Sequence, residues 1–384
     1  MNLKKLHIWQ VLGTIFITVG LFAIAQRFIY GLGATTNMRD DFPWGLWIGV
    51  DMLVGVGLAA GGFSIAAAVY IFNLERFRPI LRPTILTAFL GYTLAVVGLM
   101  CDLGRPWVIW HAIIYWNPHS VMFEVAWCVM LYTTVLFLEF VPIVFEKFKL
   151  RGPLKLMHKI TIPLVIVGVL LSTLHQSSLG SLFVVMPGRM HPLWYSNIIP
   201  FIFFISCVAA GLSMTILESH LSARAFGREI EHHLLDELGN VLVVVLALYF
   251  VVRVQDLTNR DALQYIFNGT YHGWLFLMEI TLGVIVPFFI LVWKRLRDTP
   301  RGLFYASVLI LLGFVAHRVN TTISSFEVYP VRTYIPSWQE FAVTIGLVSV
   351  GFVAFTFLTR YLNVFPEKTN GNSADGSQVP SKHP

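Results

Sequence analysis

The chain has 384 residues, of which 56% are hydrophobic and only 12% are charged. Soluble domains carry roughly 25% charged residues, so this composition excludes a large soluble protein and indicates a polytopic membrane protein. The formal net charge of +6 does not indicate nucleic-acid binding. Membrane proteins concentrate Lys and Arg in their cytoplasmic loops, which accounts for a positive balance without a nucleic-acid partner.

Ten apolar segments are long enough to cross a bilayer, which requires about 20 mostly apolar residues. We expect them near 9–29, 45–72, 83–103, 120–145, 160–182, 196–218, 238–256, 271–293, 302–322 and 339–361. The first segment is expected to be a retained helix, because the preceding MNLKKLHIWQ lacks a small-residue cleavage site. The sequence therefore predicts an all-α integral membrane protein with ten transmembrane helices.

The positive charges predict how these helices are oriented. If the loops alternate between the two sides, 19 of the 27 Lys and Arg residues fall on the side of the chain termini. The other 8 fall on the opposite side, so we expect both termini in the cytoplasm. The domain organisation is then a cytoplasmic stub at 1–8, a ten-helix membrane domain at 9–362 and a disordered polar tail at 363–384.

Two stretches predict local structure. The Trp-rich segment 106–116, PWVIWHAIIYW, is too short to span and is expected to lie at the membrane interface. The segment 55–62, GVGLAAGG, places small residues three and four positions apart, which favours close helix packing. Trp44 and Trp47 are typical of interface anchors and could also form the floor of a site.

Charged and titratable residues within the spans gather toward one end of the helices. With the predicted topology, the outer half of the membrane holds Asp51, Asp102, Arg105, Glu124, His175, Arg253, Asp256, Glu279, His317, Arg318 and Glu340. A charge in the hydrocarbon costs roughly 2.5–3.5 kcal/mol on insertion scales and is paired or functional in most cases. Each residue alone is compatible with a structural ion pair, but their shared depth favours one polar pocket that opens to the outer face.

Residues 172–181, STLHQSSLGS, end the fifth apolar segment with a histidine, a glutamine and several hydroxyls. Hydroxyls in a helix can bond the carbonyl four residues before them and be structurally silent. His175 carries a titratable proton and leaves two interpretations open. It is either a satisfied histidine between helices or a hydrogen-bond donor in a ligand site.

Metal and haem sites have little support in the sequence. The three cysteines, Cys101, Cys128 and Cys207, form no CxxC or CxxCH motif, so zinc, iron–sulfur and c-type haem sites are not indicated. Of the 12 histidines, only His175 and His317 are clearly intramembrane. One b-type haem is geometrically possible and two stacked haems are not. We expect no metal site and no haem.

Three segments resemble a known family: GLGATTNMRDDFPWGLWIGVDMLVGVGLAAGG, HQSSLGSLF and YIPSWQEFAVTIG. They are similar to segments of the NrfD/polysulfide-reductase membrane-subunit family. The resemblance runs through about residues 10–362. Within the family it is closest to the ten-helix branch of HybB-type nickel–iron hydrogenase membrane subunits and the third membrane component of the Hmc redox complex. This resemblance implies two four-helix bundles related by pseudo-symmetry, with extra helices.

The resemblance also implies a function. Such a subunit is not catalytic on its own, lies in a bacterial or archaeal cytoplasmic membrane surrounded by lipid, and binds menaquinone near the outer face. There it docks a ferredoxin-like iron–sulfur subunit, with a hydrogenase or a multihaem cytochrome behind it. Electrons pass between that partner and the quinone pool. Some family members carry the name b-type cytochrome, which the histidine count of this chain does not favour.

Candidate site residues follow from the matching motifs. Asp51 in GLWIGVD and His175 in HQSSLG match the family, and Glu124 and Arg105 match less closely. A quinone needs an apolar slot and a few donors for its carbonyls, and its reduction by two electrons takes up two protons. The expected proton donor and relay residues are His175, Asp51 and Glu124. The expected quinone contacts are His175, Gln176, Arg105, Trp47 and Asp102.

Three alternatives remain at this point. Ten helices with buried charges also fit a secondary transporter, although no inverted repeat is visible and the charges do not lie at the midplane. The chain could instead anchor a periplasmic redox complex without taking part in its chemistry. It could also belong to a complex that links periplasmic hydrogen oxidation to a reduction in the cytoplasm.

Overall fold

The computed structural model describes residues 3–40, 42–327 and 333–365. In this part of the chain ten helices are long and apolar enough to cross a membrane, which confirms the ten predicted spans. They are Gln10–Tyr30, Trp47–Ile71, Glu75–Asp102, Val121–Lys147, Arg151–Val184, Ile199–Phe226, His232–Asn259, Tyr271–Val292, Pro300–Phe326 and Trp338–Tyr361. Most of the expected polar tail, residues 366–384, lies outside the described residues.

Eight spans are built on one long helix each. These are α1 (Leu3–Tyr30), α5 (Arg78–Asp102), α7 (Val121–Lys147), α8 (Arg151–Val184), α9 (Ile199–Phe226), α10 (His232–Asn259), α14 (Pro300–Thr322) and α15 (Trp338–Tyr361). Helix α1 begins at Leu3, so it takes in most of the expected stub. Helices satisfy their backbone groups internally, which an apolar segment in lipid requires.

The second and eighth spans are interrupted by wider π-helical turns. The second consists of η1 (Trp47–Met52), α3 (Leu53–Leu58), α4 (Gly61–Ala66) and η2 (Ala67–Ile71). The eighth consists of α11 (Tyr271–Ile280), η6 (Thr281–Ile285) and α12 (Val286–Val292). Shorter elements between spans are α2 (Leu32–Thr35), η4 (Pro106–Val108), α6 (His111–Ile114), η5 (Ala262–Tyr265) and α13 (Lys294–Arg297), and the 3-10 turns η3 (Glu75–Phe77) and η7 (Ser324–Phe326) form the ends of two spans. Such π-turns are frequent at functional sites, and η1 holds Asp51.

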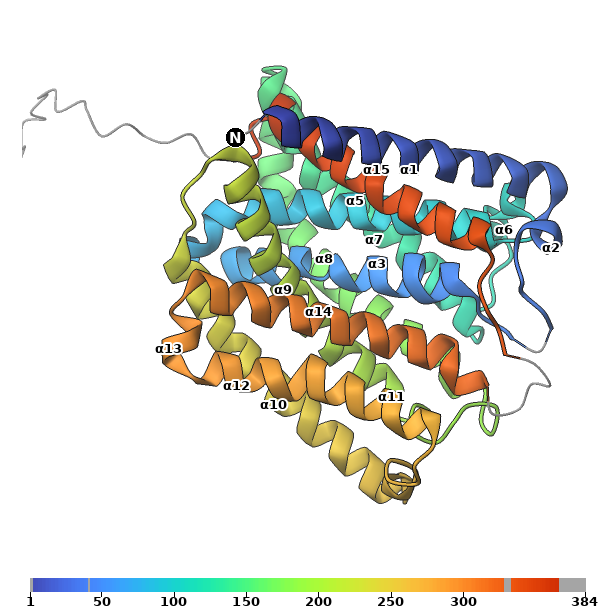
Figure 1. Ribbon diagram of the computed structural model, residues 1–384. Coiled ribbons are helices and arrows are strands. Elements are labelled where there is room, and N and C mark those ends of the chain that lie inside the picture. Colours follow the sequence, from blue (N-terminus) through green and yellow to red (C-terminus); the bar gives the residue numbers. More distant parts are fainter. Residues whose placement is uncertain (1–2, 41, 328–332, 366–384) are drawn as a thin grey trace, which may run out of the picture.

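The spans form two four-helix bundles and one separate helix pair, as Figure 1 shows. The first bundle contains the second span with α5, α7 and α8. The second bundle contains α9, α10, the eighth span and α14. Helices α1 and α15 pack on each other and, through α15, on α5. The arrangement agrees with two bundles plus extra helices.

Small residues bring the two bundles into contact. A methyl group added at Gly211 of α9 would lie 2.5 Å from the backbone carbon of Ala60, and one added at Gly57 would overlap the Phe314 ring. The segment 55–62 therefore packs against the backbone of α9 and against the Phe314 ring of α14, as its small-residue spacing predicts.

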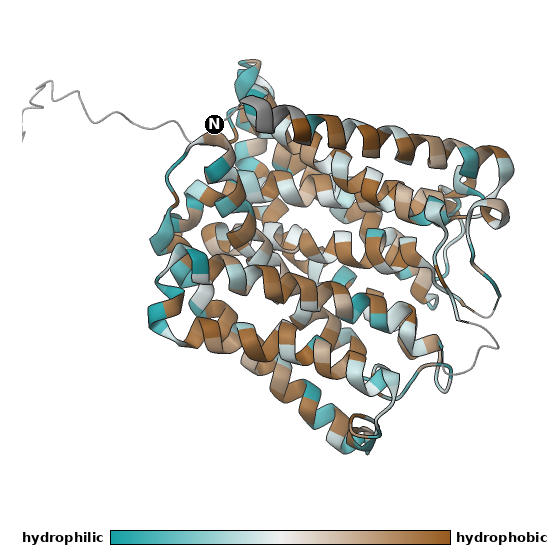
Figure 2. Cartoon of the chain, in the orientation of Figure 1, coloured by the Kyte–Doolittle hydropathy of each residue, from teal (hydrophilic) through white to brown (hydrophobic). Residues whose placement is uncertain are grey.

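The Trp-rich segment 106–116 forms only the short elements η4 and α6 and does not span. Its Trp107, Trp110 and Trp116 side chains are exposed, and Trp127 of α7 holds the segment by donating to the Ala112 carbonyl at 2.7 Å. Figure 2 shows hydrophobic residues along the long helices and hydrophilic residues gathered at their ends. The exposed tryptophans agree with the expected interfacial position of the segment.

Candidate functional site

The first bundle encloses a cavity of about 740 Å³ toward the end of the helices that carries Arg105. We call this the outer end, following the predicted orientation, and the space the outer cavity. All four spans of the bundle line it, together with residues 105–112 that follow α5. Its volume lies within the roughly 300–1,000 Å³ typical of small-molecule sites.

The lining is apolar except for a few groups. Arg105 and Trp44 lie at the outer end, and Thr133 lies deeper on α7. The Trp44 Nε1 and the Thr133 Oγ1 are buried, and neither has a hydrogen-bond partner among the described residues. A buried donor without a partner costs roughly 1–3 kcal/mol. These two free groups are therefore the natural contacts for a polar ligand atom in the cavity.

A set of polar side chains, which we call the core polar cluster, lies in the same bundle. It consists of Tyr92, Tyr132, Ser172, His175 and Gln176. The His175 ring is fully buried, 5.7 Å from the Tyr92 ring, and neither of its nitrogens has a partner among the described residues. Gln176 donates to a backbone carbonyl of α3 at 3.2 Å. The polar run STLHQSSLGS thus directs its histidine and glutamine into the bundle.

The core polar cluster lies directly behind the wall of the outer cavity. Tyr92 sits between Phe89 and Val96 of α5, which both line the cavity and are three and four residues away. Leu179 also lines it, four residues beyond His175 on α8. Residues at these spacings share one face of a helix. His175 is therefore about 6 Å inward of the cavity lining along α8.

A second cavity of about 530 Å³, the inner cavity, opens in the first bundle at the opposite end. Its lining is more polar and includes the ion pair of Arg82 and Glu146, whose atoms are 2.7 Å apart. Glu139 lines the inner cavity on the side that faces Tyr132 of the core polar cluster. A methyl group at Gly168 would be 3.3 Å from Glu139 Oε1 and 3.8 Å from a ring carbon of Tyr132. The outer and inner cavities thus follow one another along one bundle, and the core polar cluster lies beside the deeper part of the outer cavity.

Asp51 and Trp47 lie on the other side of η1, against α15. Asp51 accepts a hydrogen bond from Thr344 at 2.8 Å, and Trp47 Nε1 donates to the Glu340 carbonyl at 3.2 Å. Both residues are buried and join the first bundle to the helix pair. Asp51 also lines a separate apolar groove of about 330 Å³ that reaches Glu218 near the inner end.

Asp102 and Glu124 occupy two further places. Asp102 lies near Arg27 of α1, whose guanidinium donates to the carbonyls of Cys101 and Leu103 at 2.6 and 2.5 Å. Glu124 is exposed in the first turn of α7. Among the described residues, no hydrogen bond or ion pair joins His175, Asp51 and Glu124. Of the expected site residues, the structure brings Arg105 to the outer cavity and His175 with Gln176 behind it.

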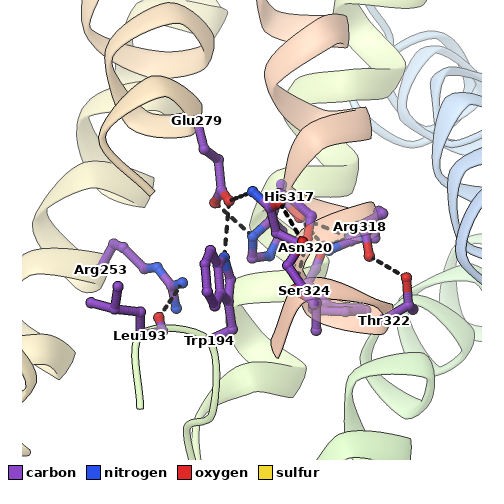
Figure 3. Close-up of polar contacts among 12 residues, drawn as sticks. Leu193, Trp194, Arg253, Glu279, His317, Arg318, Asn320, Thr322 and Ser324 are labelled. Atoms are coloured by element: carbon purple, nitrogen blue, oxygen red, sulfur yellow. Dashed lines mark hydrogen bonds and ion pairs between the residues drawn. The ribbon is translucent and has the colours of Figure 1, made fainter. Parts of the chain in front are cut away.

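The second bundle holds a third polar group, shown in Figure 3. Glu279 accepts from Trp194 Nε1 at 3.0 Å and from Asn320 at 2.8 Å, and its other oxygen is 2.8 Å from His317 Nδ1. Arg253 donates to the Leu193 carbonyl at 2.8 Å. These contacts tie the loop before α9 to α10, α11 and α14.

This second-bundle group changes the expectation of one shared outer pocket. The residues expected in one pocket lie in separate places, which include the core polar cluster, the contacts near α1 and α15, and the group around Glu279. None of the cavities described above is lined by members of more than one of these sets. Equal depth does not imply a common site, because depth says nothing about which face of a helix a side chain occupies.

Comparison with known proteins identifies the family of this chain. Residues 34–326 match the family described as polysulphide reductase, NrfD, so the chain belongs to this family. Its relatives include the integral membrane subunits of a menaquinone reductase and of an Hdr-like menaquinol oxidoreductase.

Three relatives cover nearly the whole chain. A protein of Nitratidesulfovibrio vulgaris is 38% identical over 374 residues, with 93% of this chain and 94% of the relative covered. The probable Ni/Fe-hydrogenase 2 b-type cytochrome subunit of Escherichia coli is 34% identical over 356 residues, covering 91% and 90%. The menaquinone reductase integral membrane subunit of N. vulgaris is 29% identical over 402 residues, covering 97% and 94%.

The cytochrome name of one relative raises the question of haem. A b-type haem held in a bundle needs two histidines on facing helices. His175 and His317 belong to different bundles, and His317 is paired with Glu279. Neither histidine lines one of the cavities described above. These two residues do not fit a haem held between them.

Proposed function

We propose that this chain is the membrane subunit of a respiratory redox complex that exchanges electrons with menaquinone in the outer cavity. The observation that carries the proposal is an apolar cavity of ligand size with an unpartnered donor, Trp44 Nε1, and a guanidinium, Arg105, at its outer end. The names of the relatives support it, because one is a menaquinone reductase subunit and another a hydrogenase subunit.

In this proposal the quinone ring lies at the outer end of the cavity. The Trp44 indole and the Arg105 guanidinium donate to its carbonyl oxygens. Negative charge develops on these oxygens as electrons arrive, and a fixed cation and donor stabilise that charge more than they stabilise the neutral ring. Both residues therefore accelerate reduction in addition to binding the ring.

Two protons must accompany two electrons. His175, with Gln176 and Tyr92, lies behind the cavity wall and is our proposed proton donor. The inner cavity and Glu139 provide the way for protons to reach it from the other side of the membrane. Glu124 gives a shorter route at the outer face, because it is exposed beside Val125 of the cavity wall.

Asp51, Trp47 and Asp102 are proposed to act without touching the quinone ring. Their contacts with α15 and α1 hold the outer end of η1 and α5 in position. Asp51 remains a candidate relay, since among the described residues its carboxylate accepts a hydrogen bond from the Thr344 hydroxyl alone. Trp47 and Asp102 would stabilise the outer end of the first bundle, and each lies three residues along the chain from a proposed quinone contact, Trp44 or Arg105.

The partner is proposed to be a ferredoxin-like iron–sulfur subunit on the outer loops, linked to a hydrogenase or a multihaem cytochrome. This placement needs both termini in the cytoplasm, as the distribution of Lys and Arg predicts. A reporter that is active only in the cytoplasm, fused after residue 366, should be active. Activity of a periplasmic reporter at that position would contradict the orientation.

The proposed function is tested by filling the outer cavity. Ala126 of α7 lines it, so Ala126→Trp should lower quinone reduction by the intact complex at least tenfold. Electron transfer to an artificial soluble acceptor should be unchanged. Leu170→Trp on the lipid-facing side of α8, where Leu170 is exposed, is the matched control and should leave both activities intact. Full quinone reduction by Ala126→Trp would refute a quinone site in this cavity.

A further inference from the structure

The outer cavity is much longer than a quinone ring. On α7 its lining runs from Met122 to Phe137, which is 15 residues or about 22 Å along the helix. On α5 it runs from Leu99 to Phe89, which is 10 residues or about 15 Å. A ring bound at Arg105 would leave most of this length unfilled.

The chemistry of the lining changes along that length. The charged group and the free indole N–H are at the outer end, as described above. Farther inward the wall is formed by aliphatic and aromatic side chains, including Val96, Val129 and Met130. The Thr134 hydroxyl donates to the Met130 carbonyl of its own helix at 2.8 Å, so it offers no free donor. A molecule with one polar end and a long apolar chain matches this gradient.

The inner part of the cavity reaches the lipid-facing surface between α5 and α7. Phe137 and Thr134 line the cavity and are exposed, with 48% of the Phe137 surface accessible. Val96 and Phe89 on the facing side are half-buried. The inner end is closed by the Phe89 ring, which is 6.0 Å from the Phe137 ring and stacked on Phe140 at 5.2 Å.

We infer that this inner part is the channel for the isoprenoid tail of the quinone, which enters sideways from the bilayer between α5 and α7. Thr134 and Val96 form the two lips of the entrance. The inference rests on the proposed function and adds to it the path and the position of the tail. Its length suits a chain of several isoprene units, and its wall is apolar apart from the hydroxyls of Thr133 and Thr134.

The channel gives the tail a way into the site and does not increase affinity through hydrophobic transfer. Lipid tails are as apolar as the channel wall, so moving the isoprenoid chain from lipid to protein gains little free energy. A wide slit of fixed shape instead lets the chain follow the ring without leaving an apolar environment. Obstructing the slit should therefore hinder a long-tailed quinone and spare a tailless one, which can reach the outer end directly.

The test compares two quinones in the intact complex carrying Thr134→Trp. With long-tailed menaquinone, kcat/KM should fall about tenfold or more. With menadione, which has the same ring and no tail, it should stay within about twofold, and that retained activity shows that the complex is folded. Thr134→Val, which keeps the size of the side chain, and Leu131→Trp, which faces lipid without lining the cavity, are the controls and should not discriminate.

Val96→Trp places the same obstruction on the opposite lip and should give the same discrimination. Equal loss with both quinones, or no loss with either, in both lip variants would overturn the tail channel. Failure of the proposed function looks different, because Ala126→Trp would then leave the reduction of both quinones unchanged. If Ala126→Trp lowers the reduction of both quinones but neither lip variant discriminates between them, only the tail channel is overturned.

Discussion

Replacing Trp44 with Phe separates a ligand contact from a structural one. The Trp44 Nε1 is buried and unpartnered among the described residues, so Trp44→Phe breaks no hydrogen bond within the described structure. Removal of an unsatisfied donor is close to neutral for stability, and the smaller ring loses some packing against Phe183. We expect the unfolding free energy to change by less than about 1 kcal/mol.

Activity should respond differently. If the indole N–H bonds a quinone oxygen that gains negative charge, its loss costs roughly 1.5 kcal/mol in the transition state. That corresponds to about a tenfold decrease in kcat/KM for quinone. The assay is quinone reduction by the intact complex, beside electron transfer to an artificial soluble acceptor, which should not change.

Trp47→Phe is the matched control, three residues along the chain. Trp47 is 1% exposed and its Nε1 donates to the Glu340 carbonyl, so this variant should lower the unfolding free energy by roughly 1–2 kcal/mol. Any loss of folded complex should lower the quinone activity and the soluble-acceptor activity of this variant by the same factor. Unchanged quinone activity in Trp44→Phe would refute the assignment of the indole as a quinone contact.

Further predictions concern other parts of the structure. His175→Ala should lower quinone-dependent turnover by roughly 10- to 100-fold and spare the soluble acceptor; equal loss of both would show a structural role. A pyridine-haemochrome spectrum of the purified subunit should show no stoichiometric haem b, and a haem signal lost in His317→Ala would contradict this. Gly211→Ala should overpack the bundle interface and lower the unfolding free energy by roughly 1–3 kcal/mol. The thermal midpoint of the complex should therefore fall, and an unchanged midpoint would mean that the backbones can separate there. Burial and the neighbouring His272 ring lower the pKa of His191 to about 4, so unfolding free energy should be lost as the pH falls from 6.5 toward 4. His191→Gln should reduce that loss, which thermal melts at pH 7 and pH 5 would measure.

The spans could be predicted almost completely from the sequence. Apolar length alone identified all ten, because a bilayer sets the number of residues that a helix needs. The helix ends were less accurate, and α8 begins at Arg151 where apolar length suggested 160. Charged residues such as Lys155 and Lys159 continue the helix beyond the hydrocarbon, and hydropathy cannot detect that extension. The π-turns of the second and eighth spans carry no hydropathy signal either.

The site was only partly predictable. The polar run around His175 pointed correctly into a helix bundle, and Arg105 does line the outer cavity. Trp44 was recognised only as a candidate floor or anchor, because a tryptophan near the interface has the same sequence signature in either role. Asp51 shows that the depth of a residue in the membrane does not predict which site it belongs to. It lies at nearly the depth of the outer cavity but faces α15, and only the packing of η1 determines which way it points.

The central claim is that the quinone ring binds in the outer cavity, and labelling tests it most directly. A menaquinone analogue with a photoreactive group on the ring should be bound to the intact complex, irradiated and located by mass spectrometry of the digested subunit. The label should fall in segments 44–52, 103–112 and 122–130, and excess menaquinone should prevent it. Specific labelling around Glu279 in the second bundle, with none in these segments, would contradict the claim.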